Sequence, residues 1–274
     1  MPLAPYDIDY LCTAIQSRSG NQISASQSYL LEARLAPIAQ SAGLPNVEAL
    51  VAHLRNNPRN PLHEQITEAM TINETSFFRD IQPFEVLKAE ILPTLATTRR
   101  TTRSLSIWSA ACSSGQEAYS IAMLIRNEMP SLNSWNIRIL CTDLSDEMVR
   151  RTRDGVYSQF EVNRGLPAQM LLRWFNRSGL QWQVKPELRQ LIEARKMNLT
   201  ENWSTLTQHD VVFLRNVLIY FDRRLKEQIL RRIHQAMRPD GILFLGGGET
   251  LLQLNVPFER ITVGKTVCFR PVAV

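Results

Sequence analysis

One stretch constrains the fold of this chain more than any other, namely residues 106–123. It begins with apolar residues, passes through a cluster of small side chains ending at Gly115, and continues with an apolar stripe at helical spacing from Ala118 to Ile125. This order predicts a strand, a tight turn and a helix. Small side chains let the backbone approach a ligand, and a helix start presents free N–H groups. The stretch therefore predicts a site for a nucleotide-type ligand.

The charge in this stretch indicates which ligand it favours. The glycines that hold phosphate in P-loops and dinucleotide folds are reduced here to Gly115. Glu117 falls in the first helical turn, where its carboxylate repels a phosphate and attracts a cation. An adenosine-like ligand with positive charge and no phosphate is expected, and S-adenosylmethionine fits that description. The alternative is an ordinary turn in which Glu117 only complements the helix dipole.

Strands and helices alternate through the rest of this region. A second strand, 135–143, ends at Asp143, where a carboxylate can bind a pair of ribose hydroxyls or can cap the following helix. An apolar strand that begins at Asp210 leads into Arg215 and Asn216. This alternation predicts a doubly wound, mainly parallel α/β sheet. Residues 109–117, Asp143 and Arg215–Asn216 are then expected to meet at the C-terminal edge of that sheet.

The N-terminal part has a different pattern. Residues 6–68 contain three apolar runs at helical spacing, separated by segments rich in Pro, Gly and Asn, and predict a helical domain over residues 1–68. A linker of polar and aromatic residues follows over 69–83, either as a capped connection or as part of a ligand site. Residues 84–274 then form the α/β domain, with a locally basic insertion within 150–196.

Composition narrows the function classes. No apolar run approaches the roughly 20 residues of a membrane helix, and the first residues lack a signal-peptide pattern, so a cytoplasmic, non-inserted protein is expected. The four cysteines are far apart, which predicts neither a disulfide framework nor a metal site. The net charge is +5, with residues 1–70 acidic and the remainder basic. The basic residues are scattered and lack aromatic interleaving, which disfavours nucleic acid and leaves an acidic partner or a solvated surface.

Four motifs together give the chain a recognisable character: Asn-Glu-Thr-Ser-Phe-Phe-Arg-Asp (73–80), Ala-Cys-Ser-Ser-Gly-Gln-Glu-Ala-Tyr-Ser (111–120), Thr-Asp-Leu-Ser (142–145) and Phe-Leu-Arg-Asn-Val-Leu-Ile-Tyr-Phe (213–221). With these motifs the sequence resembles, over nearly its whole length, the CheR family of chemotaxis-receptor methyltransferases. That family transfers methyl groups from S-adenosylmethionine to receptor glutamates. The resemblance implies a Rossmann-like methyltransferase sheet, a small N-terminal all-helical domain, and a small antiparallel β-subdomain at about 165–196.

The resemblance also implies roles for individual residues. Residue by residue, it assigns to the cofactor pocket Asn73, Thr75, Arg79, Glu117, Asp143, Asn198, Leu199, Arg215 and Asn216. Glu117 is expected to hold the methionine end, Asp143 the ribose, and Asn198–Leu199 with Arg215–Asn216 the adenine and sulfonium region. Arg79 and Tyr220 are expected to be catalytic, because they correspond to the family's candidates for engaging the substrate.

Implied partners are the cytoplasmic helical region of chemotaxis receptors, reached at membrane receptor arrays, and regulatory proteins. The loop Arg-Ser-Gly-Leu-Gln (177–181) lacks the glycine-rich sequence of members that bind a receptor tail peptide, so tail-independent binding is expected. Relatives often carry several basic residues on the second N-terminal helix, whereas residues 29–40 offer only Arg34. The receptor contact is therefore expected elsewhere.

The expected chemistry is direct displacement. A glutamate carboxylate, with an ordinary pKa of about 4.3, is already a nucleophile at pH 7, so neither a strong base nor a metal is required. Alignment and desolvation are the main demands. Two other classes remain open, a nucleic-acid base methyltransferase and a non-enzymatic receptor adapter. The first usually carries an Asn/Asp-Pro-Pro-aromatic run where this chain has Leu-Arg-Asn-Val (214–217).

Overall fold

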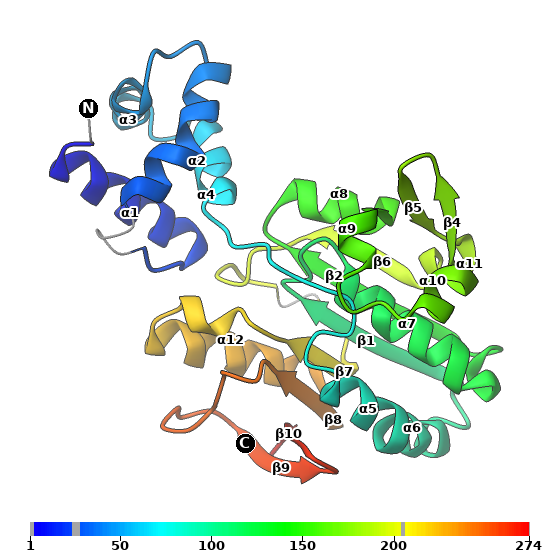
Figure 1. Ribbon diagram of the computed structural model, residues 1–274. Coiled ribbons are helices and arrows are strands. Elements are labelled where there is room, and N and C mark those ends of the chain that lie inside the picture. Colours follow the sequence, from blue (N-terminus) through cyan, green and yellow to red (C-terminus); the bar gives the residue numbers. More distant parts are fainter. Residues whose placement is uncertain (1–2, 24–27, 204–205, 274) are drawn as a thin grey trace. The chain divides into compact units, whose positions relative to one another are not determined.

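The computed structural model describes residues 3–23, 28–203 and 206–273 (Figure 1). The chain divides into two compact units. The first contains residues 1–72 and a short return, 220–225, and the second contains residues 73–219 and 226–274.

The first unit is helical, as its sequence predicts. Its described helices are α1 (Pro5–Ser19), α2 (Ser28–Ser41), α3 (Val47–Asn56) and α4 (Leu62–Ala69). Apolar side chains from all four meet in one core, including Leu11, Leu35, Leu50 and Ile66. Helix α4 did not stand out in the sequence because it is short and contributes Ile66 as its one fully buried aliphatic side chain.

The second unit is built on a seven-stranded sheet in the order β6-β2-β1-β7-β8-β10-β9. Its strands are β1 (Ser104–Ala110), β2 (Asn136–Asp143), β6 (Ile192–Lys196), β7 (His209–Leu214), β8 (Met237–Leu245), β9 (Phe258–Val263) and β10 (Thr266–Pro271). The first five strands in this order are parallel, and β10 runs antiparallel to β8 and β9. The chain starts in the middle of the sheet and moves to either side, which confirms the doubly wound topology.

Helices cover the sheet. They are α5 (Gln82–Val86), continued by a π-helical turn η2 (Leu87–Ile91) into α6 (Leu92–Thr98), then α7 (Gln116–Glu128), α8 (Asp146–Asp154), α11 (Pro186–Arg189) and α12 (Arg223–Gln235). Alternate strand residues face different layers. Ile107 and Phe213 belong to one core with α5, α6 and α7, whereas Trp108 packs edge-on against Trp203 at a centroid distance of 5.2 Å.

A second, three-stranded antiparallel sheet has the order β3-β5-β4, with β3 (Val156–Ser158), β4 (Phe175–Ser178) and β5 (Gln181–Val184). Short helices α9 (Gln159–Val162) and α10 (Ala168–Trp174) lie between β3 and β4 in the chain. We call residues 156–184 the insertion. Its position differs from the expected 165–196, because residues 192–196 form β6, which pairs in parallel with β2 at the edge of the main sheet.

Two further details differ from the sequence pattern. Residues 238–241, whose sequence Arg-Pro-Asp-Gly is typical of a turn, lie within β8, where the register against β7 shifts between His209 and Val211. Strand β9 was not anticipated, because Glu259 and Arg260 follow one another and break the apolar–polar alternation of a strand that lies at the edge of the sheet. None of the helices in the described ranges is long and apolar enough to cross a membrane.

Candidate functional site

The turn after β1 has the backbone that close approach to a ligand requires. Ala111, Ser113 and Gly115 all adopt left-handed conformations, with φ of 54°, 52° and 91°. A Cβ atom at Gly115 would lie 2.9 Å from the side chain of Thr152, so both conformation and space demand glycine there. The turn then leads directly into α7, whose first residue is Gln116. We call residues 111–115 the cofactor turn.

Asp143 ends β2 beside this turn and is 6% exposed. Its Oδ2 accepts a hydrogen bond from the Ser113 amide (2.8 Å), and its Oδ1 accepts one from the Ser145 amide (3.0 Å). Ser145, and not Asp143, is the N-cap of α8, since its hydroxyl accepts from the Met148 amide. Two backbone donors thus fix the orientation of the Asp143 carboxylate at the strand end, where a ribose diol can be bound.

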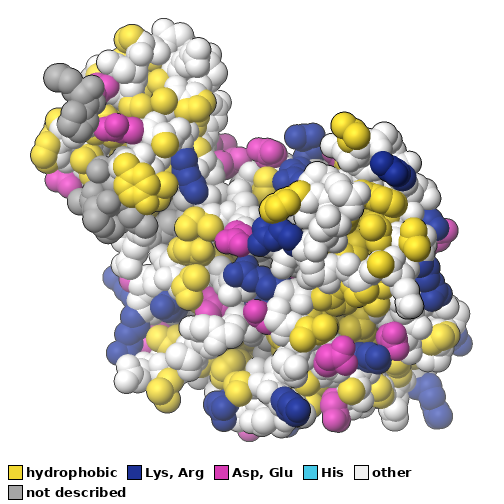
Figure 2. Space-filling model, viewed as in Figure 1, with side chains coloured by type: hydrophobic (Ala, Val, Ile, Leu, Met, Phe, Trp, Pro, Cys, Tyr) yellow, Lys and Arg dark blue, Asp and Glu magenta, His cyan; other side chains and the backbone are white. Residues whose placement is uncertain are grey.

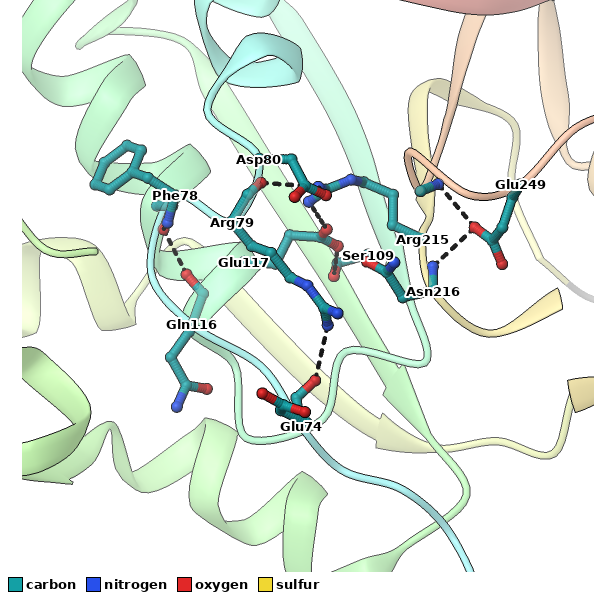
Figure 3. Close-up of polar contacts among 12 residues, drawn as sticks. Glu74, Phe78, Arg79, Asp80, Ser109, Gln116, Glu117, Arg215, Asn216 and Glu249 are labelled. Atoms are coloured by element: carbon teal, nitrogen blue, oxygen red, sulfur yellow. Dashed lines mark hydrogen bonds and ion pairs between the residues drawn. The ribbon is translucent and has the colours of Figure 1, made fainter. Parts of the chain in front are cut away.

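Glu117 and Arg215 form a buried ion pair at the same edge (Figure 3). Arg215 follows β7, its side chain is 2% exposed, and its Nη1 lies 2.9 Å from Glu117 Oε2. Its Nη2 donates to the Asp80 carboxylate (2.8 Å) and to the Arg79 carbonyl (2.8 Å). Ser109 Oγ donates to Glu117 Oε1 (2.7 Å). The two carboxylates exceed the one guanidinium by one negative charge, so this cluster favours a cation.

Arg79 makes a different set of contacts from its neighbour Asp80. Its Nη1 donates to the Glu74 carbonyl (3.0 Å), and Figure 3 shows its guanidinium extending away from Arg215. Within the described ranges, Arg79 makes no ion pair with a carboxylate. The ion pair that ties this part of the chain to the sheet is made instead by Asp80, which pairs with Arg215.

We call residues 73–80 the connecting segment. It is bonded to the cofactor turn and to α7: Ser113 Oγ donates to the Asn73 carbonyl (2.7 Å), and the Phe78 amide donates to Ser120 Oγ (3.0 Å). Phe78 and Asp80 have left-handed φ values of 49° and 62°, which turn the chain sharply around Arg79. Thr75 is partly exposed in this segment. Two of the expected residues of this segment are thus tied to the sheet edge, Asn73 through Ser113 and Arg79 through Arg215.

Asn216 lies in a turn that a carboxylate organises, and the sequence analysis missed that carboxylate. Asn216 has a φ of 60°, and Glu249 accepts hydrogen bonds from four backbone amides around it. Oε2 accepts from Asn216 (2.8 Å) and Gly246 (2.7 Å), and Oε1 accepts from Val217 (2.9 Å) and Leu218 (2.7 Å). The signal was present as Gly-Gly-Gly-Glu at 246–249, directly after a buried strand.

The remaining two expected groups lie in different places. Asn198 and Leu199 follow β6 beside Asp143, because the Met197 amide donates to the Asp143 carbonyl (2.8 Å). Asn198 Oδ1 accepts from the Thr200 amide (3.0 Å), and Leu199 is 7% exposed. Tyr220 belongs to the first compact unit, where its carbonyl accepts from the Gln22 amide (3.0 Å). Its catalytic role stays a prediction.

Tyr157 and Cys112, which lie near the turn, are not candidate nucleophiles. Burial raises the pKa of Tyr157 well above its usual value, and contact with the Cys141 thiol together with burial raises the pKa of Cys112. Both side chains therefore stay protonated at neutral pH. Across the part of the chain that the structure describes, no group of three or more His, Cys, Asp or Glu side chains could hold a metal ion.

Comparisons with known proteins agree with this geometry. A family model described as CheR methyltransferase, SAM binding domain matches residues 73–267, and one described as CheR methyltransferase, all-alpha domain matches residues 6–71. Chemotaxis protein methyltransferase Cher2 of Pseudomonas putida is 39% identical, over 96% of this chain and 97% of its own. Chemotaxis protein methyltransferase 1 of Pseudomonas aeruginosa is 37% identical, over 98% and 99%. Its namesake in Vibrio cholerae is 34% identical, over 94% of both chains. The chain therefore belongs to the CheR family of methyltransferases.

Proposed function

We propose that this protein transfers methyl groups from S-adenosylmethionine to glutamate side chains of chemotaxis receptors, giving glutamate methyl esters and S-adenosylhomocysteine. The observation that carries the proposal is the charge arrangement at one sheet edge. A fixed carboxylate, Asp143, stands beside a net negative cluster of Asp80, Glu117 and Arg215, with Arg79 nearby and, among the described residues, not paired with a carboxylate. The names of the relatives support a role in chemotaxis.

In this proposal the cofactor is held by groups of three kinds. Asp143 accepts hydrogen bonds from the ribose hydroxyls, because its carboxylate is already oriented by Ser113 and Ser145. The negative charge around Glu117 attracts the positively charged methionine end. The small side chains of the cofactor turn allow the cofactor to approach the backbone closely. Asn198, Leu199 and Asn216 complete the adenine and sulfonium region.

The transfer step demands alignment more than acid–base chemistry. S-adenosylmethionine supplies an electrophilic methyl group, which a carboxylate oxygen accepts as the carbon–sulfur bond breaks and a neutral thioether leaves. Arg79 orients the incoming carboxylate with its planar, two-pronged donor, and Arg215 holds the Arg79 main chain in place through its carbonyl. No proton moves in this step, which explains why the site needs no base.

The receptor contact is proposed to lie outside helix α2 and to need no receptor tail peptide. Arg34, the basic residue of α2, donates from its Nη1 to the Ala69 carbonyl (3.2 Å) and the Thr71 carbonyl (3.0 Å). Its guanidinium thus stabilises the C-terminal end of α4. On the face drawn in Figure 2, Lys and Arg side chains are spread among acidic and uncharged ones and form no continuous basic track of the kind that nucleic acid binds. An acidic helical region on the cytoplasmic side of a receptor is the proposed substrate.

A methyl-transfer competition tests the proposal. Purified protein is incubated with labelled S-adenosylmethionine, receptor-containing membranes, RNA and DNA in one vessel, and each fraction is counted. Label is expected in receptor protein and is released by mild base, because carboxyl esters hydrolyse there. Label in nucleic acid, or protein label that resists base, would overturn the assignment. Cofactor binding without any transfer would favour the adapter alternative.

A further inference from the structure

The connecting segment is held by the insertion as well as by the cofactor turn. The Phe77 amide donates to the Arg164 carbonyl (3.2 Å), which places the main chain of residues 164–165 against Phe77. Gly165 has a φ of +85°, and a Cβ atom there would lie 2.0 Å from the Phe77 carbonyl oxygen. No real Cβ contact is that short. Any side chain at position 165 must therefore push the main chain of Phe77 aside.

The side chain of Phe77 is fixed by the same insertion. It is 1% exposed, and its ring packs edge-on against Tyr157 of β3 and Phe175 of β4, at centroid distances of 5.1 and 5.8 Å. Arg164 adds an ion pair with Glu74 of the connecting segment (2.8 Å). Both main chain and side chain of Phe77 are thus positioned by the insertion, two residues before Arg79.

Asp143 and Glu117, two of the groups assigned to the cofactor, have side-chain partners outside the insertion. Asp143 is held by Ser113 and Ser145, and Glu117 by Ser109 and Arg215, all of them outside the insertion. Displacing Phe77 should therefore move Arg79 more than it moves Asp143 or Glu117. The contribution of the insertion can therefore be measured as a fall in kcat that is larger than any change in cofactor affinity.

We propose that Phe77 and Gly165 are positioning residues through which the insertion holds Arg79 in the geometry that methyl transfer needs. The inference rests on the proposed function, because it assigns Arg79 to the transfer step. A shift of about 1 Å in a group that orients a substrate can cost on the order of 100-fold in rate. The insertion thereby sets turnover, in addition to any surface it offers to a partner.

The test compares Gly165→Ala with Gly179→Ala. Gly179 lies between β4 and β5 in the same insertion and also has a positive φ, +60°, but a Cβ atom there meets nothing within 4 Å. Both variants place a side chain at a positive φ, and only Gly165→Ala displaces Phe77. We expect Gly165→Ala to lower kcat for receptor methylation about 10- to 100-fold, with the calorimetric Kd for S-adenosylmethionine within about threefold of the unmodified protein. Gly179→Ala should match the unmodified protein in both.

Phe77→Leu is the second variant, because it keeps an apolar side chain while removing the aromatic edge contacts. It tests the same positioning role if Gly165→Ala does not fold. A normal kcat in the folded fraction of either variant overturns the inference. A parallel fall in kcat, cofactor affinity and thermal stability also overturns it, because that pattern indicates a merely structural role. Failure of the unmodified protein to methylate receptors, with cofactor binding intact, instead overturns the proposed function.

Discussion

Replacing Glu249 by glutamine changes one atom of a side chain that organises the loop after β7. In the native chain each carboxylate oxygen accepts two backbone N–H groups, those of Asn216 and Gly246 on Oε2 and those of Val217 and Leu218 on Oε1. A glutamine offers one acceptor oxygen and one NH₂ group. Whichever way the amide turns, two N–H donors face another donor.

The size of the effect follows from those two lost bonds. Leaving a buried donor unsatisfied costs about 1–3 kcal/mol, and the partial exposure of Glu249 favours the lower half of that range. Glu249→Gln should therefore lower the free energy of unfolding by about 2–4 kcal/mol. At about 2–4 °C per kcal/mol for a domain of this size, the melting temperature of the second unit should fall by about 5–15 °C.

The assay is urea unfolding followed by circular dichroism, together with calorimetric titration of S-adenosylmethionine under conditions where the variant is folded. Glu259→Gln is the matched control, because Glu259 is 48% exposed and its only described ion pair, with Arg270, spans 3.4 Å. That control should change stability by less than about 0.5 kcal/mol. Cofactor affinity should fall in Glu249→Gln, since the Asn216 backbone loses its support. Equal stability and affinity in the two variants would refute the role assigned to Glu249.

Three further outcomes are expected. Asp143→Ala should weaken S-adenosylmethionine binding by about 1–3 kcal/mol through lost charge-assisted hydrogen bonds, and an unchanged calorimetric Kd in a folded variant would remove Asp143 from the site. Arg79→Ala should lower kcat about 100-fold or more, and Arg79→Lys should restore it only partly, because lysine loses the two-pronged geometry. Tyr220→Phe should lower kcat less than Arg79→Ala does. A normal kcat for Arg79→Ala in steady-state assays would contradict this. Burial, aided by two nearby arginines, lowers the pKa of His209 to about 4 from 6.5. The free energy of unfolding should therefore be highest above about pH 6.5 and should decline by up to about 3 kcal/mol as the pH falls to about 4. Urea titrations should show a smaller decline in His209→Asn, and equal declines in both proteins would exclude His209 as the cause.

The local parts of this site could be predicted from the sequence. A strand, a small-residue turn and a helix are all set by neighbours in the chain, so β1, the cofactor turn and α7 were predicted together. Asp143 and Arg215 could be placed because parallel strands deliver their C-terminal residues to one edge. The same rule explains why the sheet topology followed from the alternation of strands and helices.

Contacts between distant residues could not be predicted in the same way. Asp80 meets Arg215 across 135 positions, and Phe77 meets Gly165 through a main-chain contact that leaves no apolar pattern. Strand β6 was placed in the insertion because a short basic segment at a sheet edge resembles an exposed hairpin strand until its pairing with β2 is known. Glu249 was missed because its four partners are backbone amides, so that its one sequence signal is the Gly-Gly-Gly-Glu run after a buried strand, which names no partner.

The position of the transferred methyl group tests the central claim most directly. A purified cytoplasmic receptor fragment is incubated with S-adenosylmethionine and either the unmodified protein or Arg79→Ala, and its peptides are sequenced by tandem mass spectrometry before and after mild base. The account predicts methyl groups on glutamate side chains, removed by base and nearly absent with Arg79→Ala. Methyl groups on lysine, arginine or the peptide N-terminus, stable to base and formed equally by both proteins, would contradict it.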